Sequence, residues 1–250
     1  MGKVFRRRVV FAALVAACGG AFLMRERLFP RLSRRPAPRD IVEIRKRVTP
    51  GLADAFERAG LRLGAPVFMR IFKEERMLEL WVQAGTAFRL FRSYPICNYS
   101  GDLGPKLREG DRQSPEGFYF VGASAMNPNS SYHLSFNLGF PNAYDREQGR
   151  TGSYLMVHGD CLSIGCYAMT DPAIEEIYLA AEAALAAGQP FFRVHAFPFR
   201  MTAARMRAAE DVRWEAFWAN LKTGYDAFED GHVPPDVRVR DGIYHFVENT

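Results

Sequence analysis

The sequence contains few side chains that hold metals or cross-link the chain. Its 250 residues include four cysteines and five histidines. This is too few for a small disulfide-rich scaffold. The single metal alternative is a zinc site through His158, Cys161 and Cys166, because no other cysteine or histidine group has ligand spacing. We therefore expect a protein without a metal or another cofactor.

Long apolar runs are also scarce. An uncharged apolar run covers residues 9–24, which is shorter than the roughly 17–25 residues of a membrane-spanning helix. Four basic residues precede it and two follow, so residues 1–27 are predicted to be a signal or anchor segment. The body would then be periplasmic or otherwise extracytoplasmic. Cleavage, a retained helix, or lipidation of Cys18 after Val15-Ala16-Ala17 remain open.

The body lacks the basic excess that nucleic-acid binding requires. The formal net charge is +5, and the first 40 residues contribute +8, so the remaining 210 carry −3. A basic leader on an acidic body is no argument for a nucleic-acid partner. We expect membrane contact through the N-terminus alone.

The organisation of the body can be read from periodicity and turn residues. Residues 28–64 are predicted to be a Pro/Arg-rich linker followed by a short helix that begins at Thr49-Pro50. The residues that follow show the alternating, β-branched and aromatic pattern of strands, and this pattern indicates about seven strands. They are expected at residues 67–72, 78–82, 86–94, 118–121, 133–138, 154–158 and 191–196.

Two longer helices are predicted towards the C-terminus. The first begins at Asp171-Pro172 and ends at Gly188. The second covers residues 203–228, where large apolar side chains recur at helical spacing and indicate core packing. The sequence thus predicts a mixed, mainly β domain over residues 65–200 with flanking helices, and a helical extension over residues 201–250.

One segment carries the pattern of a reactive thiol. His158 and Cys166 are eight residues apart, and Gly159 and Gly165 adjoin them. A thiol attacks carbonyl groups as the thiolate, and a nearby imidazole is the usual group that takes its proton. Glycine beside each reactive residue lets the backbone approach a substrate closely. This pattern predicts a cysteine acyl-transfer site.

The redox state of this thiol depends on cysteine pairing. Outside the leader there are three cysteines, Cys97, Cys161 and Cys166, so at least one thiol stays free in an oxidising compartment. Pairing of Cys97 with Cys161 would leave Cys166 free. Pairing of Cys161 with Cys166 would silence the site until reduction, and the sequence does not choose between them.

The same segment resembles the YkuD-type L,D-transpeptidase family. The matching motifs are His158-Gly159 and Ser163-Ile164-Gly165-Cys166, in which Ile164 replaces the usual histidine. Upstream, residues 114–119 are similar to the family's Thr-Pro-x-Gly-x-Phe turn. The resemblance covers residues 65–198. Further matches indicate a YafK-like branch of the family; they lie at residues 132–133, 140–145, 165–170, 197–201, 224–226 and 234–237.

The resemblance implies a fold, a reaction and roles for residues. The fold would be a β-sandwich or barrel-like domain, and the reaction peptidoglycan L,D-transpeptidation. Cys166 would attack the third residue of the stem peptide, and His158 would take the thiol proton. The Gly159 carbonyl would orient the histidine, while Ser163 and the backbone at Gly165 would support the oxyanion.

The sequence says less about which residues contact the substrate and which molecule accepts the acyl group. His133 and Arg200 are candidates for substrate binding, although a loop histidine and a solvated arginine are the plain alternatives. The His158–Cys166 loop is shorter than is typical of the family, which bears on the acceptor. An amine acceptor gives transpeptidation, whereas water gives a hydrolase that detaches lipoprotein from the wall, as associated with the YafK-like branch. A non-catalytic wall-binding module is the third hypothesis.

Overall fold

The computed structural model describes residues 40–209 and 212–247. The chain divides into two units, Met1–Pro38 and Arg39–Thr250, and the description below concerns the second. The predicted signal or anchor segment and residues 28–39 of the predicted linker lie outside the described residues. No helix in the described ranges is long and apolar enough to cross a membrane.

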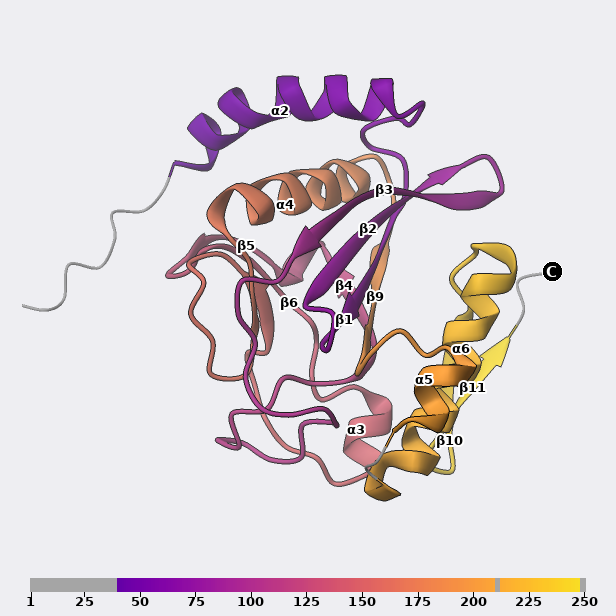
Figure 1. Ribbon diagram of the computed structural model, residues 1–250. Coiled ribbons are helices and arrows are strands. Elements are labelled where there is room, and N and C mark those ends of the chain that lie inside the picture. Colours follow the sequence, from indigo (N-terminus) through magenta and orange to yellow (C-terminus); the bar gives the residue numbers. More distant parts are fainter. Residues whose placement is uncertain (1–39, 210–211, 248–250) are drawn as a thin grey trace, which may run out of the picture. The chain divides into compact units, whose positions relative to one another are not determined.

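A five-stranded sheet forms the centre of this unit (Figure 1). Its strand order is β3-β2-β1-β9-β4, with β1 parallel to β9 and the other neighbours antiparallel. The bounds are β1 Val67–Phe72, β2 Met77–Ala84, β3 Ala87–Pro95, β4 Gly117–Gly122 and β9 Phe191–Phe197. Five of the seven predicted strands therefore belong to one sheet.

Alternation along β1 explains why both faces of this sheet are covered. Val67, Met69 and Ile71 face one apolar core, while Phe68 and Phe72 face clusters on the opposite side. Successive side chains of a strand point to opposite faces. All six residues of β1 are buried, so the strand is apolar apart from Arg70.

A second, four-stranded sheet shares the first of these cores. It has the order β5-β6-β7-β8, with bounds β5 Met126–Ser130, β6 His133–Asn137, β7 Met156–His158 and β8 Tyr167–Ala168. Phe136 of β6 meets Phe192 of β9 edge to face at 5.3 Å. The mixed, mainly β fold is confirmed. Its two sheets are separate, and no barrel closes within the described part of the chain.

Two helices lie side by side at one margin of this core (Figure 1). Helix α4, Asp171–Ala186, agrees with the prediction. Helix α2, Ile41–Arg58, begins eight residues before Thr49, so the predicted start is wrong. Asp40 caps α2 by accepting a hydrogen bond from the Val42 N–H at 2.9 Å. The helix extends to this cap because Ile44 is already buried, and Pro50 lies inside it.

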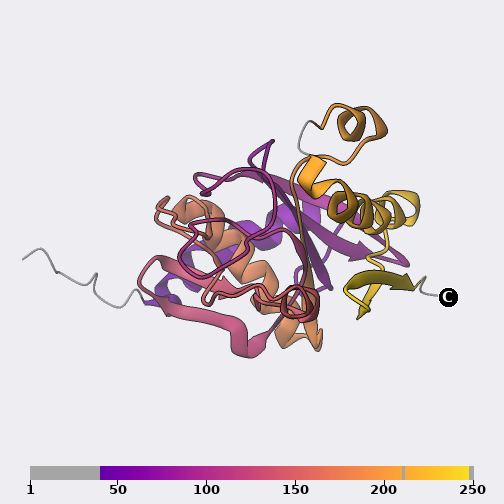
Figure 2. The same cartoon turned by 90° about the horizontal axis from the view of Figure 1, so that it is seen from below.

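The C-terminal region covers the other face of the five-stranded sheet. The predicted helix over 203–228 is divided into α5, Ala203–Arg207, and α6, Glu215–Gly231, and a hairpin of β10, Asp236–Arg240, and β11, Ile243–Val247, follows. Helix α6 and the hairpin lie together on one side (Figure 2). Short helices complete the described part: α3 Ala143–Glu147, η1 Ala123–Ala125 and η2 Val212–Trp214.

Candidate active site

Cys166 immediately precedes strand β8, and His158 ends the neighbouring parallel strand β7. The register pairs Val157 of β7 with Tyr167 of β8, so the preceding position pairs Met156 with Cys166. Side chains alternate along a strand, so Cys166 and His158 share the face opposite Val157.

Cys166 is the free cysteine of the described region, because Cys97 and Cys161 form a disulfide. The disulfide settles the pairing alternatives and removes Cys161 from the proposed zinc ligand set. No group of three or more His, Cys, Asp and Glu residues with metal-holding geometry occurs in the ranges that the structure describes.

Backbone groups of β7 and of the residues before it hold the Cys166 thiol. The Met156 N–H donates to Sγ at 3.4 Å, and the thiol points to the Tyr154 carbonyl oxygen at 3.6 Å. Burial raises the pKa of Cys166, while the Met156 N–H and the charge of Lys106 act in the opposite direction. This burial favours the neutral thiol over the thiolate.

His158 is buried with a defined ring orientation. Its Nδ1 lies 2.5 Å from the carbonyl oxygen of Gly159, and a carbonyl can only accept, so the neutral ring carries its proton on Nδ1. Nε2 is then free to accept a proton. Burial lowers the pKa of His158, against the smaller effects of the Gly159 carbonyl and Asp160.

The turn that carries Cys166 is built around Ser163. The Ser163 hydroxyl donates to the Cys166 carbonyl at 2.7 Å and accepts from the Gly165 N–H at 3.2 Å. Gly165 has a φ of +142°, which an L side chain would resist. The Gly165 N–H, expected to support an oxyanion, is thus bonded inside the turn.

Ser114 is a site residue that the sequence analysis missed. Its hydroxyl also donates to the Cys166 carbonyl, at 3.1 Å. Ser114 is held in turn by Lys73, whose Nζ donates to the Ser114 carbonyl at 3.1 Å and to Glu116 at 2.9 Å. Trp218 of α6 donates to the same carboxylate at 2.9 Å. The signal was present, because residues 114–119 form the family-like turn.

Of the two candidate substrate-binding residues, His133 lies next to Gly159 but is turned towards α4, and Arg200 lies elsewhere. His133 is buried, and its Nε2 is 2.8 Å from Glu175 of α4. Arg200 pairs with Glu79 at 2.5 Å and lies over the Phe72 ring, on the sheet face that packs against α6. The structure brings together His158, Gly159, Ser163, Gly165 and Cys166, and it does not bring Arg200 to them.

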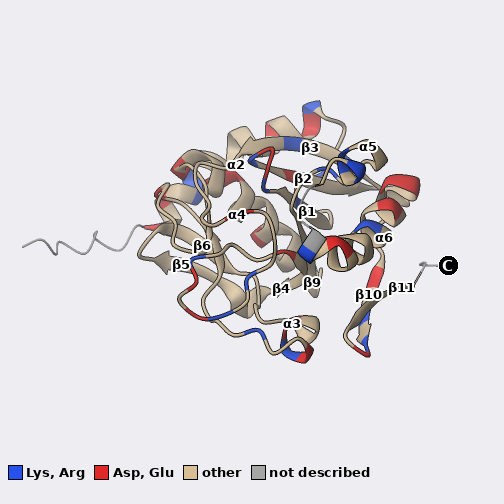
Figure 3. Cartoon of the chain, turned by 60° about the horizontal axis from the view of Figure 1, so that its bottom comes forward, with Lys and Arg blue, Asp and Glu red and all other residues tan. Residues whose placement is uncertain are grey.

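Charged residues around the fold are mixed in sign. Lys and Arg segments alternate with Asp and Glu segments along the helices and loops in the view of Figure 3. Around the thiol, by contrast, three large apolar side chains, Tyr154, Leu162 and Ile164, are exposed. The loops that carry His158 and Cys166 therefore expose apolar side chains beside the charged Asp160.

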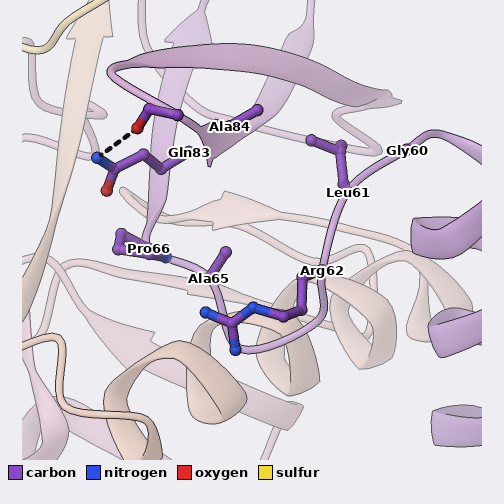
Figure 4. Close-up of a pocket in the computed structure, with 8 residues that line it drawn as sticks. Gly60, Leu61, Arg62, Ala65, Pro66, Gln83 and Ala84 are labelled. Atoms are coloured by element: carbon purple, nitrogen blue, oxygen red, sulfur yellow. Dashed lines mark hydrogen bonds between the residues drawn. The ribbon is translucent and has the colours of Figure 1, made fainter.

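A separate hollow of about 610 Å³ lies between the end of α2 and the β2–β3 turn (Figure 4). Gln83 Nε2 donates there to the Gly85 carbonyl at 3.1 Å. Arg62 is the charged residue of its lining, which is otherwise Gly60, Leu61, Ala65, Pro66, Gln83, Ala84 and Gly85. This lining holds no nucleophile or acid–base group, so the hollow is not a candidate catalytic site.

Comparison with known proteins agrees with the motif. The family model of the L,D-transpeptidase catalytic domain (YkuD) matches residues 67–186. The Escherichia coli K12 protein named "Putative L,D-transpeptidase YafK" is 52% identical over 182 residues, which cover 73% of this chain and 74% of that protein. Its counterpart in strain O157:H7 matches equally well.

Among solved structures, the helical cell shape determining protein Pgp2 (K307A mutant) from Campylobacter jejuni overlaps with 70% of this chain and 62% of its own. The identity is 20% and the TM-score 0.44, an overlap too small to bear on function. The identity to the curated relatives and the catalytic-domain match carry the assignment: the chain belongs to the YkuD-type L,D-transpeptidase family.

Proposed function

We propose that this protein is a cysteine acyltransferase that performs L,D-transpeptidation on peptidoglycan stem peptides. One observation carries the proposal: the free thiol of Cys166 lies at the start of β8, which pairs with the strand that ends in His158, and the His158 ring has its Nδ1 bonded to the Gly159 carbonyl and its Nε2 left to accept a proton. Nucleophile, base and orienting group are the three parts that covalent catalysis by cysteine requires.

The first half-reaction would form a thioester. Nε2 of His158 takes the thiol proton as Sγ of Cys166 attacks the carbonyl carbon of the diaminoacid at position three. The C–S bond forms and the carbonyl electron pair moves to oxygen. When this intermediate collapses, the amide bond to the fourth residue breaks, and the imidazolium returns its proton to the leaving amine.

The second half-reaction would release the acyl group. His158 takes a proton from the acceptor, which attacks the thioester carbon, and the C–S bond breaks to restore the Cys166 thiol. Ser163 and Ser114 hold the Cys166 carbonyl and so fix the backbone turn that presents Sγ.

Hydrolysis is the second candidate, with water as the acceptor. The exposed apolar side chains of Tyr154, Leu162 and Ile164, in the loops next to Cys166, are available to contact a polypeptide partner. A wall-bound lipoprotein would be such a partner, and its release would make the protein an L,D-hydrolase.

The proposed location is the periplasm or another extracytoplasmic space, with attachment to the membrane through residues 1–27. The Cys97–Cys161 disulfide supports an oxidising compartment. A tethered enzyme would work on the wall within reach of its anchor.

The substitution Cys166→Ala tests catalysis against the third hypothesis, a wall-binding module. We expect turnover to fall roughly 10³-fold or more, as for other catalytic nucleophiles. The thermal unfolding midpoint should stay near that of the parent protein, because one half-buried sulfur is lost. Unchanged product formation in this variant would contradict the proposal.

Mass spectrometry of wall fragments then separates the two enzyme classes. The purified protein is incubated with lipoprotein-bearing sacculi, and the Cys166→Ala variant serves as the matched control. New cross-links between two position-three diaminoacids identify a transpeptidase. Freed lipoprotein or shortened stems without new cross-links identify a hydrolase.

A further inference from the structure

The turn after β7 is held from beneath by side chains that belong to other elements. The Asp160 N–H donates to Asp171 Oδ1 at 2.9 Å. A Cβ atom built on Gly159 would lie 2.6 Å from that same oxygen and 2.9 Å from the Cβ of His133. Asp171 and His133 therefore press directly against Gly159, whose carbonyl orients His158.

His133 and two carboxylates of α4 form one cluster. His133 Nε2 is 2.8 Å from Glu175 Oε1, and His133 Nδ1 is 3.9 Å from Asp171 Oδ2. Asp171 and Glu175 are four residues apart and so lie on one face of the helix. Arg47 of α2 closes the cluster by donating to Glu175 at 2.7 Å.

We propose that His133, Asp171 and Glu175 are positioning residues that fix the Gly159 carbonyl and thereby the imidazole of His158. Arg47 links this cluster to α2. None of the four is assigned contact with the substrate. The inference rests on the proposed role of His158 as the base.

The expected effect follows from the geometry of proton transfer. The Gly159 carbonyl accepts from Nδ1 at 2.5 Å, so a displaced carbonyl turns the ring and misdirects Nε2. A misplacement of about 1 Å in a catalytic group can cost up to about 100-fold in rate. Because the cluster does not touch the substrate, kcat should fall while KM stays constant.

The two helices supply a matched control. Arg45 pairs with Glu182 at 2.6 Å and Arg47 pairs with Glu175 at 2.7 Å, so two ion pairs join α2 to α4. Of the two carboxylates, that of Glu175 also contacts His133. Glu175→Ala and Glu182→Ala thus remove the same group from the same helix.

We expect Glu175→Ala to lower kcat by roughly 10- to 100-fold, and Glu182→Ala to leave kcat within about twofold of the parent. Glu175→Gln keeps an oxygen that accepts from Nε2 and should restore most of kcat. His133→Asn tests the other partner, since asparagine tolerates the φ of +67° at this position. The His133→Asn variant also replaces Glu175→Ala as the test if Glu175→Ala does not fold.

A spectroscopic readout separates this inference from the proposed function. The Nδ1–H proton of His158 should give a downfield NMR signal because of its short bond to Gly159. The signal should shift upfield or broaden in Glu175→Ala and persist in Glu182→Ala. It is measurable even if Cys166→Ala shows the catalytic proposal to be wrong. Equal kcat values and equal ring signals in the two alanine variants would overturn the inference.

Discussion

The two sides of the five-stranded sheet contrast in how they use polar groups. On the α6 side, Arg70 is buried among the rings of Phe72, Trp81, Tyr225 and Phe228, at 4.7 to 5.5 Å, and pairs with Glu79. On the side of the four-stranded sheet, a thiol, two hydroxyls and backbone carbonyls form the candidate site, and the cluster of His133, Glu175 and Arg47 lies behind them. On the α6 side, the charged groups pair with one another. At the candidate site, individual polar atoms, such as Sγ of Cys166, are instead available to a substrate.

Positive φ values occur on both sides. Four non-glycine residues near the site have them, His133, Tyr154, Asp160 and Cys161, and so do Arg76, Arg112, His232 and Asp241 elsewhere in the described chain. Non-glycine residues hold this conformation at a cost, and only when their surroundings enforce it. The Cys97–Cys161 disulfide and the His133 cluster supply that enforcement. The strained residues at the site are thus held by a covalent crosslink and by a polar cluster.

The largest effect is expected where the two sides are joined. Lys73 and Glu116 are fully buried, and Trp218 donates to Glu116. The substitution Glu116→Gln leaves the Lys73 charge unpaired, which costs about 3–5 kcal/mol. Urea unfolding measures this loss.

The double variant with Lys73→Met is the control for Glu116→Gln. It removes the buried charge, and the glutamine oxygen can still accept from Trp218, so part of the stability should return. If Glu116→Gln alone unfolds at the urea concentration of the parent protein, the buried Lys73–Glu116 pair does not contribute to stability.

Loss of the disulfide is the next largest change. Replacing Cys97 and Cys161 by serine opens a crosslink between residues 64 apart, and we expect stability to fall by about 2–4 kcal/mol. Activity should fall as well at temperatures where the variant is folded, because Cys161 lies in the strained turn. Full activity of the folded variant would show that the turn does not need this clamp.

The pH dependence of activity and of alkylation distinguishes a neutral Cys166–His158 pair from a thiolate–imidazolium ion pair. Burial lowers the pKa of His158 and raises that of Cys166, so the imidazole stays neutral below the usual histidine range and the thiol stays neutral above the usual cysteine range. The protein should keep more than about half of its maximal kcat/KM at pH 6.5. Alkylation by iodoacetamide should still accelerate above about pH 8.5.

An acid limb of the kcat/KM profile centred above pH 7, together with rapid alkylation at pH 6, would indicate a thiolate–imidazolium pair instead. The His158→Gln variant is the control, since it should lose the acid limb altogether.

The smallest effect is expected at Arg200, which the contacts assign to the α6 side. Arg200→Met removes a partly exposed ion pair with Glu79 and should cost about 1 kcal/mol or less. KM should not change. A tenfold rise in KM would restore the earlier hypothesis that Arg200 binds substrate.

Local patterns were enough to predict the strands of the central sheet and helix α4. Alternation or continuous burial marks β1 and β2, and Asp171-Pro172 marks the start of α4. The two-residue strand β8 was missed because it is shorter than any periodic signal. The β10–β11 hairpin was also missed, although Asp241-Gly242 is a favoured turn between alternating strands.

The candidate nucleophile and base were predictable, but the groups behind them were not. His158 and Cys166 are close in sequence and carry a motif. Lys73 begins a short charged stretch over residues 73–76, and Glu175 is one of several glutamates on a helix. Only the fold shows that Lys73 is fully buried and that Glu175 meets His133 from a position 42 residues away. Their role depends on tertiary contacts that leave no local pattern.

The strand order of the central sheet has a consequence for how the chain acquires its structure during synthesis. β1 pairs with β9, and β4 joins the sheet through β9 alone. All four strands that frame the candidate site lie between β4 and β9 in the chain. Non-local pairings of this kind slow folding. The site-bearing segment thus has no completed sheet to rest on until residue 197 has emerged, so folding must await nearly the whole chain.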